Sequence, residues 1–133
     1  MEVKPIKINK PILEIPVNDN NDTIKINLND QIFIKNFLDM AKYGQENRPK
    51  SEESNVDKTF LYCKELSKRV NLTFGEGTVK KIFDTEEPTI DLFMDFILQL
   101  DPYIEQAIEI KNKSIKNIEN AYLKRQKSRG MGK

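Results

Sequence analysis

The sequence contains no histidine, and Cys63 is its single cysteine. Histidine is the commonest general base in enzymes and a frequent metal ligand, so its absence excludes Ser–His and Cys–His nucleophile pairs. A zinc site would have to be built from carboxylates, which zinc sites rarely are. We therefore expect a protein that is not an enzyme and that holds no metal and no cofactor. A lone cysteine also excludes an intramolecular disulfide, and a reducing cytoplasm is the simplest compartment.

Long apolar runs are missing as well. No run approaches the roughly 20 apolar residues of a membrane-spanning helix, and the first residues lack the apolar segment of a secretory signal. We therefore expect a cytoplasmic protein that does not bind membranes. The 133 residues, 38% of them apolar and 32% charged, suffice for one domain with a modest core or with a core that a partner completes.

Charge is distributed unevenly along the chain. Residues 1–110 carry 14 Lys or Arg and 20 Asp or Glu, a net charge of −6, whereas residues 111–133 carry eight Lys or Arg and one Glu, a net charge of +7. This contrast predicts a mildly acidic domain, residues 1–123, followed by a disordered basic tail, residues 124–133.

The tail contains four candidate contact residues: Lys124, Arg125, Lys127 and Arg129. Basic side chains bind the phosphates of nucleic acids. However, Tyr122 is the only aromatic residue interleaved with them, and the rest of the chain is acidic. An arm that contacts a protein partner, or that keeps the chain soluble, is favoured over nucleic-acid binding.

Residues 12–28 have the pattern of an antiparallel β-hairpin. In the second half Ile24, Ile26 and Leu28 alternate with polar residues, as in a half-buried strand. Pro16 cannot donate a backbone hydrogen bond, which predicts an edge strand. Residues 3–9 predict a third short extended piece. Because an isolated hairpin is marginal in water, this one must pack on helices or on a neighbouring subunit.

The first two helices follow the hairpin. One begins at an N-cap, Asn29 or Asp30, and stops near Gly44. Residues 45–55 are wholly polar and predict a flexible loop, with an acidic or phosphorylatable patch as the alternative. The next helix begins after Ser54 or Asn55 and carries a stripe of apolar residues at three- to four-residue spacing: Val56, Phe60, Cys63, Leu66 and Val70. On that stripe Cys63 is interpreted as a small buried hydrophobe rather than a reactive thiol.

The second half of the chain predicts further helices. A short one has Thr78 as its N-cap, and a longer one begins near Pro88. Proline disfavours helical geometry in the residue before it, so the pair Asp101-Pro102 predicts a break and a new helix that reaches Tyr122. The expected fold class is therefore α+β, mainly α, with four to five helices and a small N-terminal hairpin.

Residues 74–83 (Phe-Gly-Glu-Gly-Thr-Val-Lys-Lys-Ile-Phe) superficially look like a phosphate-binding loop. The glycine spacing fits neither G-x-x-x-x-G-K-[ST] nor G-x-G-x-x-G, and Glu76 would repel an anion. A chain reversal in which Gly75 and Gly77 adopt positive φ is the better interpretation. Phe74 and Phe83 bracket this turn and can pack together. We expect Phe74, Ile82 and Phe83 to make a protein contact.

An acidic set lies after this turn: Glu86, Glu87, Asp91, Asp95 and Asp101. Asp91 and Asp95 share a helix face, but no glycine-containing calcium loop accompanies them. A solvated face, or a surface for a basic partner, is favoured over a metal site.

Three segments together resemble a known family. They are residues 24–33 (Ile-Lys-Ile-Asn-Leu-Asn-Asp-Gln-Ile-Phe), the stretch 74–83, and residues 90–96 (Ile-Asp-Leu-Phe-Met-Asp-Phe) with the basic C-terminal stretch behind them. Over residues 12–127 the chain resembles small proteins encoded in the tail modules of phages and prophages of low-GC Gram-positive bacteria. These proteins are described as tail assembly chaperones or as tail-associated proteins.

The resemblance implies a protein-binding chaperone that keeps the tape measure protein soluble while the phage tail assembles, in the cytoplasm of the bacterial host. It implies no catalytic or metal-binding residues. Three alternatives remain at this point. The chain could be a virion or tail connector protein that forms homo-oligomers by strand addition at the hairpin, a small nucleic-acid-associated regulator that uses the basic tail, or a carboxylate-dependent enzyme.

Overall fold

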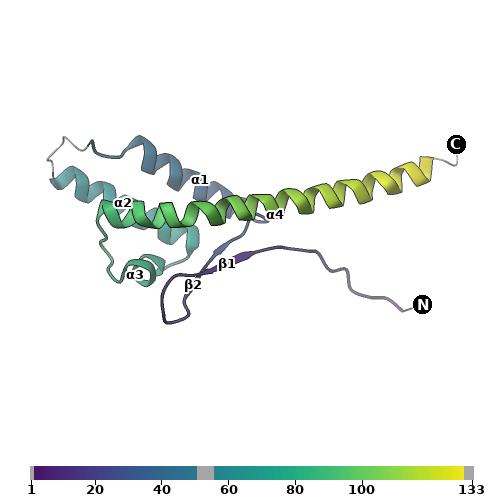
Figure 1. Cartoon of the computed structure of the whole chain (residues 1–133), viewed down its shortest axis with the longest axis horizontal. Coiled ribbons are helices and arrows are strands. Elements are labelled where there is room, and N and C mark those ends of the chain that lie inside the picture. Colours follow the sequence, from purple (N-terminus) through teal and green to yellow (C-terminus); the bar gives the residue numbers. More distant parts are fainter. Residues whose placement is uncertain (1, 51–55, 131–133) are drawn as a thin grey trace.

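A computed structural model describes residues 2–50 and 56–130 of the chain. The fold is α+β and mainly α, as predicted. In chain order its elements are β1 (Leu13–Pro16), β2 (Thr23–Ile26), α1 (Gln31–Glu46), α2 (Val56–Phe74), α3 (Thr78–Phe83) and α4 (Ile90–Gly130). Figure 1 shows α4 lying across a body formed by the other elements and continuing far beyond it. The N-terminal segment leaves the body in the same direction.

The two strands form the predicted antiparallel hairpin, in which Ile15 lies opposite Ile24. Ile15, Ile24 and Ile26 are buried, so the alternation read from the sequence corresponds to a covered face. The first strand ends at Pro16, as expected of an edge strand. Residues 3–9, where a further extended piece was expected, form no strand in the structure.

Asn18 holds the hairpin turn and attaches it to α3. Its side-chain oxygen accepts hydrogen bonds from the backbone N–H groups of Asn20 (2.8 Å) and Asp22 (3.3 Å). Its side-chain Nδ2 donates to the Asp22 carboxylate (2.8 Å) and to the backbone carbonyl of Lys81 (3.0 Å). The position of the hairpin against the helices is therefore fixed by polar contacts as well as by the buried isoleucines.

The start of α1 is as predicted and its end is not. Asp30 is the N-cap, and its carboxylate accepts the backbone N–H of Ile32 at 2.9 Å. The helix runs past Gly44 to Glu46. The Gly44 carbonyl is one of the last four in the helix, and it accepts a hydrogen bond from the hydroxyl of Tyr62 at 2.6 Å. The predicted loop at 45–55 therefore begins later, at residue 47. Its residues 51–55, with the expected caps of α2, lie outside the described part.

The turn between α2 and α3 confirms that the two glycines adopt positive φ, with +118° at Gly75 and +82° at Gly77. Thr78, however, is not the N-cap. Gly77 occupies that position, and the Thr78 hydroxyl donates to the Gly75 carbonyl at 2.6 Å. The capping role passes to Asn71, whose side-chain oxygen accepts the backbone N–H of Val79 at 2.9 Å.

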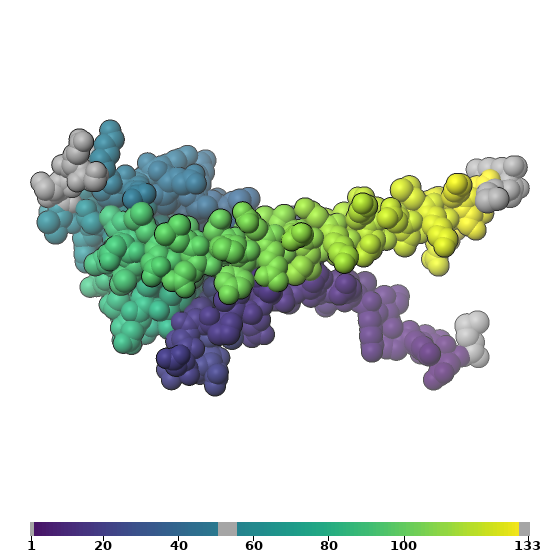
Figure 2. All heavy atoms as spheres, viewed as in Figure 1, coloured from purple at the N-terminus to yellow at the C-terminus, as the bar shows by residue number. Residues whose placement is uncertain are grey.

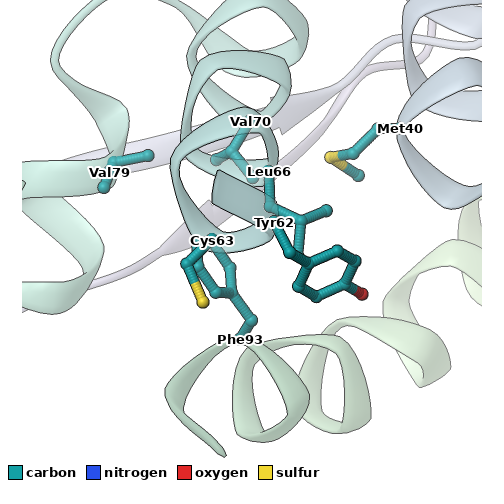
Figure 3. Close-up of a cluster of buried hydrophobic side chains, with 7 residues drawn as sticks. All are labelled: Met40, Tyr62, Cys63, Leu66, Val70, Val79 and Phe93. Carbon is teal, nitrogen blue, oxygen red and sulfur yellow. The ribbon is translucent and has the colours of Figure 1, made fainter. Parts of the chain in front are cut away.

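Two clusters of buried side chains form the core. The first lies between the helices and is drawn in Figure 3: Met40, Tyr62, Cys63, Leu66, Val70, Val79 and Phe93. The second lies between the hairpin, α1 and α4: Ile15, Ile24, Ile26, Phe33, Leu100 and Ala107. The cysteine is thus part of the packed core, as the sequence predicts.

Helix α4 is continuous through Pro102, so the predicted break at Asp101 is wrong. Proline removes one intrahelical hydrogen bond. Pro102 lies on the exposed side of the helix, where water can satisfy the carbonyl that loses its donor. The buried face of α4 is formed by Phe93, Leu100 and Ala107. A basic tail was expected from residue 124, but residues 124–130 are the last turns of this helix, and residues 131–133 lie outside the described part.

Candidate protein-binding surfaces

The three residues predicted to contact a protein are half-buried and pack within the body. The Phe74 ring makes edge contacts with Phe33 and with Phe96 of α4, at centroid distances of 5.8 and 6.2 Å. The Phe83 ring contacts Phe96 at 5.7 Å and Phe93 at 5.1 Å. The expected packing of Phe74 with Phe83 is therefore mediated by Phe96, the ring that both contact.

Ile82 and Phe83 line a groove of about 330 Å³ between the hairpin, α3 and α4. We call it the hairpin groove. Its walls include Ile15, Val17, Ile82, Phe83, Phe96 and Tyr103. Phe74 is not among the lining residues, so the structure brings two of the three predicted residues to one surface and assigns Phe74 to the interior.

The rim of the hairpin groove is mixed in character. Leu92 and Tyr103 are 38% and 42% exposed at its α4 edge. The polar side chains of Asp95 and Gln99 lie on the same edge and hydrogen-bond to each other at 3.0 Å. An apolar floor with a partly polar rim is the arrangement found in protein-binding sites.

A second groove, of about 440 Å³, lies between α1, α2 and the first half of α4. We call it the α1–α4 groove. Met40 and Ala41 of α1 line one wall, and Ile90, Met94, Ile97, Asp101 and Ile104 line the α4 wall. The guanidinium of Arg48 lies 3.1 Å from the Met94 sulfur at one end.

Beyond the body, α4 continues as a projecting segment, residues 112–130. At about 1.5 Å per residue this segment is about 28 Å long. Its apolar side chains include Ile118 and Tyr122, each 62% exposed. Figure 2 shows the segment standing clear of the body. Four of its cations are the candidate basic residues Lys124, Arg125, Lys127 and Arg129, all exposed. They lie in the last turns of α4, at positions spread around the helix.

Asn29 marks the point where the projecting segment leaves the body. Its side-chain oxygen accepts a hydrogen bond from the Lys111 amine at 2.8 Å, and its side-chain nitrogen donates to the backbone carbonyl of Pro11 at 2.8 Å. One side chain therefore joins α4 to the base of the N-terminal segment.

Sequence reasoning missed a continuous row of side chains along α4. Its positions alternate four and three residues apart over the whole length: Ile90, Met94, Ile97, Asp101, Ile104, Ile108, Lys111, Ile115, Ile118, Tyr122 and Arg125. We call this row the seam. The signal was present in the sequence, but the break assigned to Pro102 divided it into two short halves.

The structure raises the pKa values of one thiol and two phenols. Burial raises the pKa of the Cys63 thiol, with a smaller contribution from the Asp91 carboxylate. Burial likewise raises the pKa values of Tyr43 and Tyr62. All three groups are therefore held in their neutral forms near pH 7. Within residues 2–50 and 56–130 no cluster of three or more acidic or cysteine side chains could hold a metal ion.

The described helices include none that combines the length and the apolar character required to cross a membrane. Comparisons with protein-family models, with curated proteins and with solved structures gave no match.

Proposed function

We propose that the protein binds another protein without catalysing a reaction, in the manner of the tail assembly chaperones that its sequence resembles. The partner in this proposal is the tape measure protein. The observation that carries the proposal is the hairpin groove, where Ile82 and Phe83 share an open apolar surface with the hairpin and α4. The proposal places the protein in the cytoplasm of the bacterial host.

The groove offers its partner a moderate amount of binding energy. Fully burying an apolar side chain contributes about 1.5–3 kcal/mol, so covering the exposed two-fifths of Leu92 contributes about 1 kcal/mol. Tyr103 is exposed to a similar extent and contributes a comparable amount. A few such contacts support a reversible complex, which suits a chaperone because it must release its client.

An amphipathic helix is the partner element that fits this surface best. Such a helix presents apolar residues in a narrow ridge at three- and four-residue intervals, and grooves bind it by covering that ridge. Long helices with apolar ridges are also what a tape measure chaperone would have to keep soluble.

Co-expression tests the proposal. The chain is expressed together with the tape measure protein of the same phage, and the soluble fraction of that protein is measured. We expect solubility to increase with the wild-type chain and with Leu72→Asp, which changes an exposed residue outside the groove. Leu92→Asp places a carboxylate on the groove and should abolish the increase. If the wild-type chain leaves the solubility unchanged, the proposed function is wrong.

Self-association was an alternative in the sequence analysis, where strand addition at the hairpin was its expected route. In the structure the seam of α4 favours it instead. The hairpin has its apolar face buried in the body, whereas Ile97, Ile108 and Ile118 of the seam are 47%, 45% and 62% exposed. The apolar and charged residues of the seam indicate which partner it would bind.

A further inference from the structure

The charges of α4 are separated into two halves. Residues 90–110 contain five Asp or Glu and no Lys or Arg, a net charge of −5, and residues 111–130 contain seven Lys or Arg and one Glu, a net charge of +6. The helix dipole favours acidic residues at the start and basic residues at the end, but only within the first and last turns. Here the separation extends through the full helix. An antiparallel neighbour with the same separation would place the acidic half of each helix beside the basic half of the other.

The seam has the spacing of a coiled coil. Its positions average 3.5 residues apart, which keeps one stripe of a helix facing a second helix. Beside the body, the buried residues Phe93, Leu100 and Ala107 form one flank of the seam, and the seam residues Ile90 and Ile104 are half-buried against the core. Ile97 is 47% exposed there, and Ile108 is 45% exposed where the body ends.

One antiparallel register matches the seam of one copy with that of another. It places these residues opposite each other: Ile90 and Tyr122, Met94 and Ile118, Ile97 and Ile115, Ile104 and Ile108. In the same register Asp101 of each copy lies opposite Lys111 of the other, so the two-fold dimer contains this pair twice. A charged pair inside an otherwise apolar seam fixes register and orientation. The Lys111 amine donates one of its three hydrogens to Asn29, so two remain for the pair with Asp101.

We propose that a second copy of the chain covers the seam and forms an antiparallel two-fold dimer. The projecting segment of each copy lies in the α1–α4 groove of the other. The acidic half of each α4, residues 90–110, then lies beside the basic half of the other, and Asp101 in the groove wall lies opposite Lys111. Each body lies on the flank of the seam marked by Leu100. The antiparallel arrangement directs the two bodies toward opposite ends of the helix pair.

This dimer does not rest on the proposed function. The hairpin groove uses a different face of α4, on which Leu92, Phe96 and Tyr103 lie. Both surfaces can be occupied at once, and each can be removed by substitution without the other.

Sedimentation of the full chain over a range of concentrations tests the dimer. The double variant Ile115→Asp/Ile118→Asp changes the seam, and Asn117→Asp/Asn120→Asp adds the same charge on the opposite face of the same turns. We expect the wild-type chain and the control to form dimers. The dissociation constant of the seam variant should be at least about 100-fold higher, because the dimer would bury the added carboxylates. Thermal melts show whether the body stays folded. A wild-type chain that is monomeric throughout, or a control as weak as the seam variant, overturns the dimer.

Charge reversal tests the register. Asp101→Lys and Lys111→Asp should each weaken the dimer by about tenfold or more, and the double variant should recover most of the loss. A parallel pair would place like residues opposite each other and would show no recovery. Raising the ionic strength from about 0.1 to 1 M shortens the Debye length from about 10 to 3 Å and should weaken the wild-type dimer. Absence of recovery in the double variant contradicts the proposed register.

The two proposals fail separately. If the dimer forms and the tape measure protein stays insoluble, the proposed function fails and the dimer stands. If the wild-type chain is monomeric and the seam variant no longer solubilises the tape measure protein, the seam belongs to that partner and the dimer is wrong.

Discussion

Replacing both glycines of the α2–α3 turn by alanine tests whether this turn is structural. Gly75 and Gly77 adopt φ of +118° and +82°. An L-residue with a positive φ raises the free energy of the folded state by about 1–2 kcal/mol. Alanine also lowers the conformational entropy of the unfolded chain, which stabilises the folded state by about 0.4–1 kcal/mol per site. A Cβ at Gly77 would meet no atom within 4 Å, and at Gly75 only the Thr78 hydroxyl at 3.8 Å, so crowding adds little. We expect Gly75→Ala/Gly77→Ala to lower the free energy of unfolding by about 1–2 kcal/mol.

The assay is urea denaturation followed by circular dichroism, with Gly130→Ala as the control. Gly130 is helical and a Cβ there would meet nothing within 4 Å. Since alanine favours the helix, this control should leave stability unchanged or raise it slightly. Unchanged stability in the double glycine variant would refute the structural interpretation of the turn and reopen the question of a ligand there.

Three further changes affect stability at separate places. Tyr62→Phe leaves the Gly44 carbonyl without its hydroxyl donor and should lower the free energy of unfolding by about 1–2 kcal/mol. Asp30→Ala removes the N-cap of α1 and should lower it by about 1 kcal/mol; urea titration measures both. Folding raises the pKa values of Cys63, Tyr43 and Tyr62 above their ordinary 9.0 for the thiol and 10.0 for the phenols. The folded state therefore holds these protons more tightly, so stability should be constant up to about pH 9 and fall above it. Denaturation midpoints that stay constant to pH 11 would contradict this.

Local chemistry made several elements predictable. The alternation of Ile24, Ile26 and Leu28 indicates one covered face, and Asp30 before an apolar helix is a strong N-cap signal. The positive φ of Gly75 follows from a turn that no other residue type would make easily. Each of these depends on residues close together in the sequence.

The misplaced features depend on distant contacts. Gly44 lies inside α1, where Tyr62, far along the chain, donates a hydrogen bond to its carbonyl. Pro102 does not end α4 because it lies on the exposed side, and nothing near it in the sequence specifies which side is exposed. Once α4 is known to be continuous, the seam follows from spacing alone. The hairpin groove could not be foreseen, because it joins β1, α3 and α4 only in the folded chain.

The most direct measurement of the central claim is co-elution of the purified chain with the purified tape measure protein on a size-exclusion column. We expect a complex with the wild-type chain and with Leu72→Asp, and at least about a tenfold loss of affinity with Leu92→Asp, which removes apolar contact and adds a charge at the hairpin groove. If the wild-type chain forms no complex, or if both variants bind as well as it does, the claim that this groove binds the tape measure protein is contradicted.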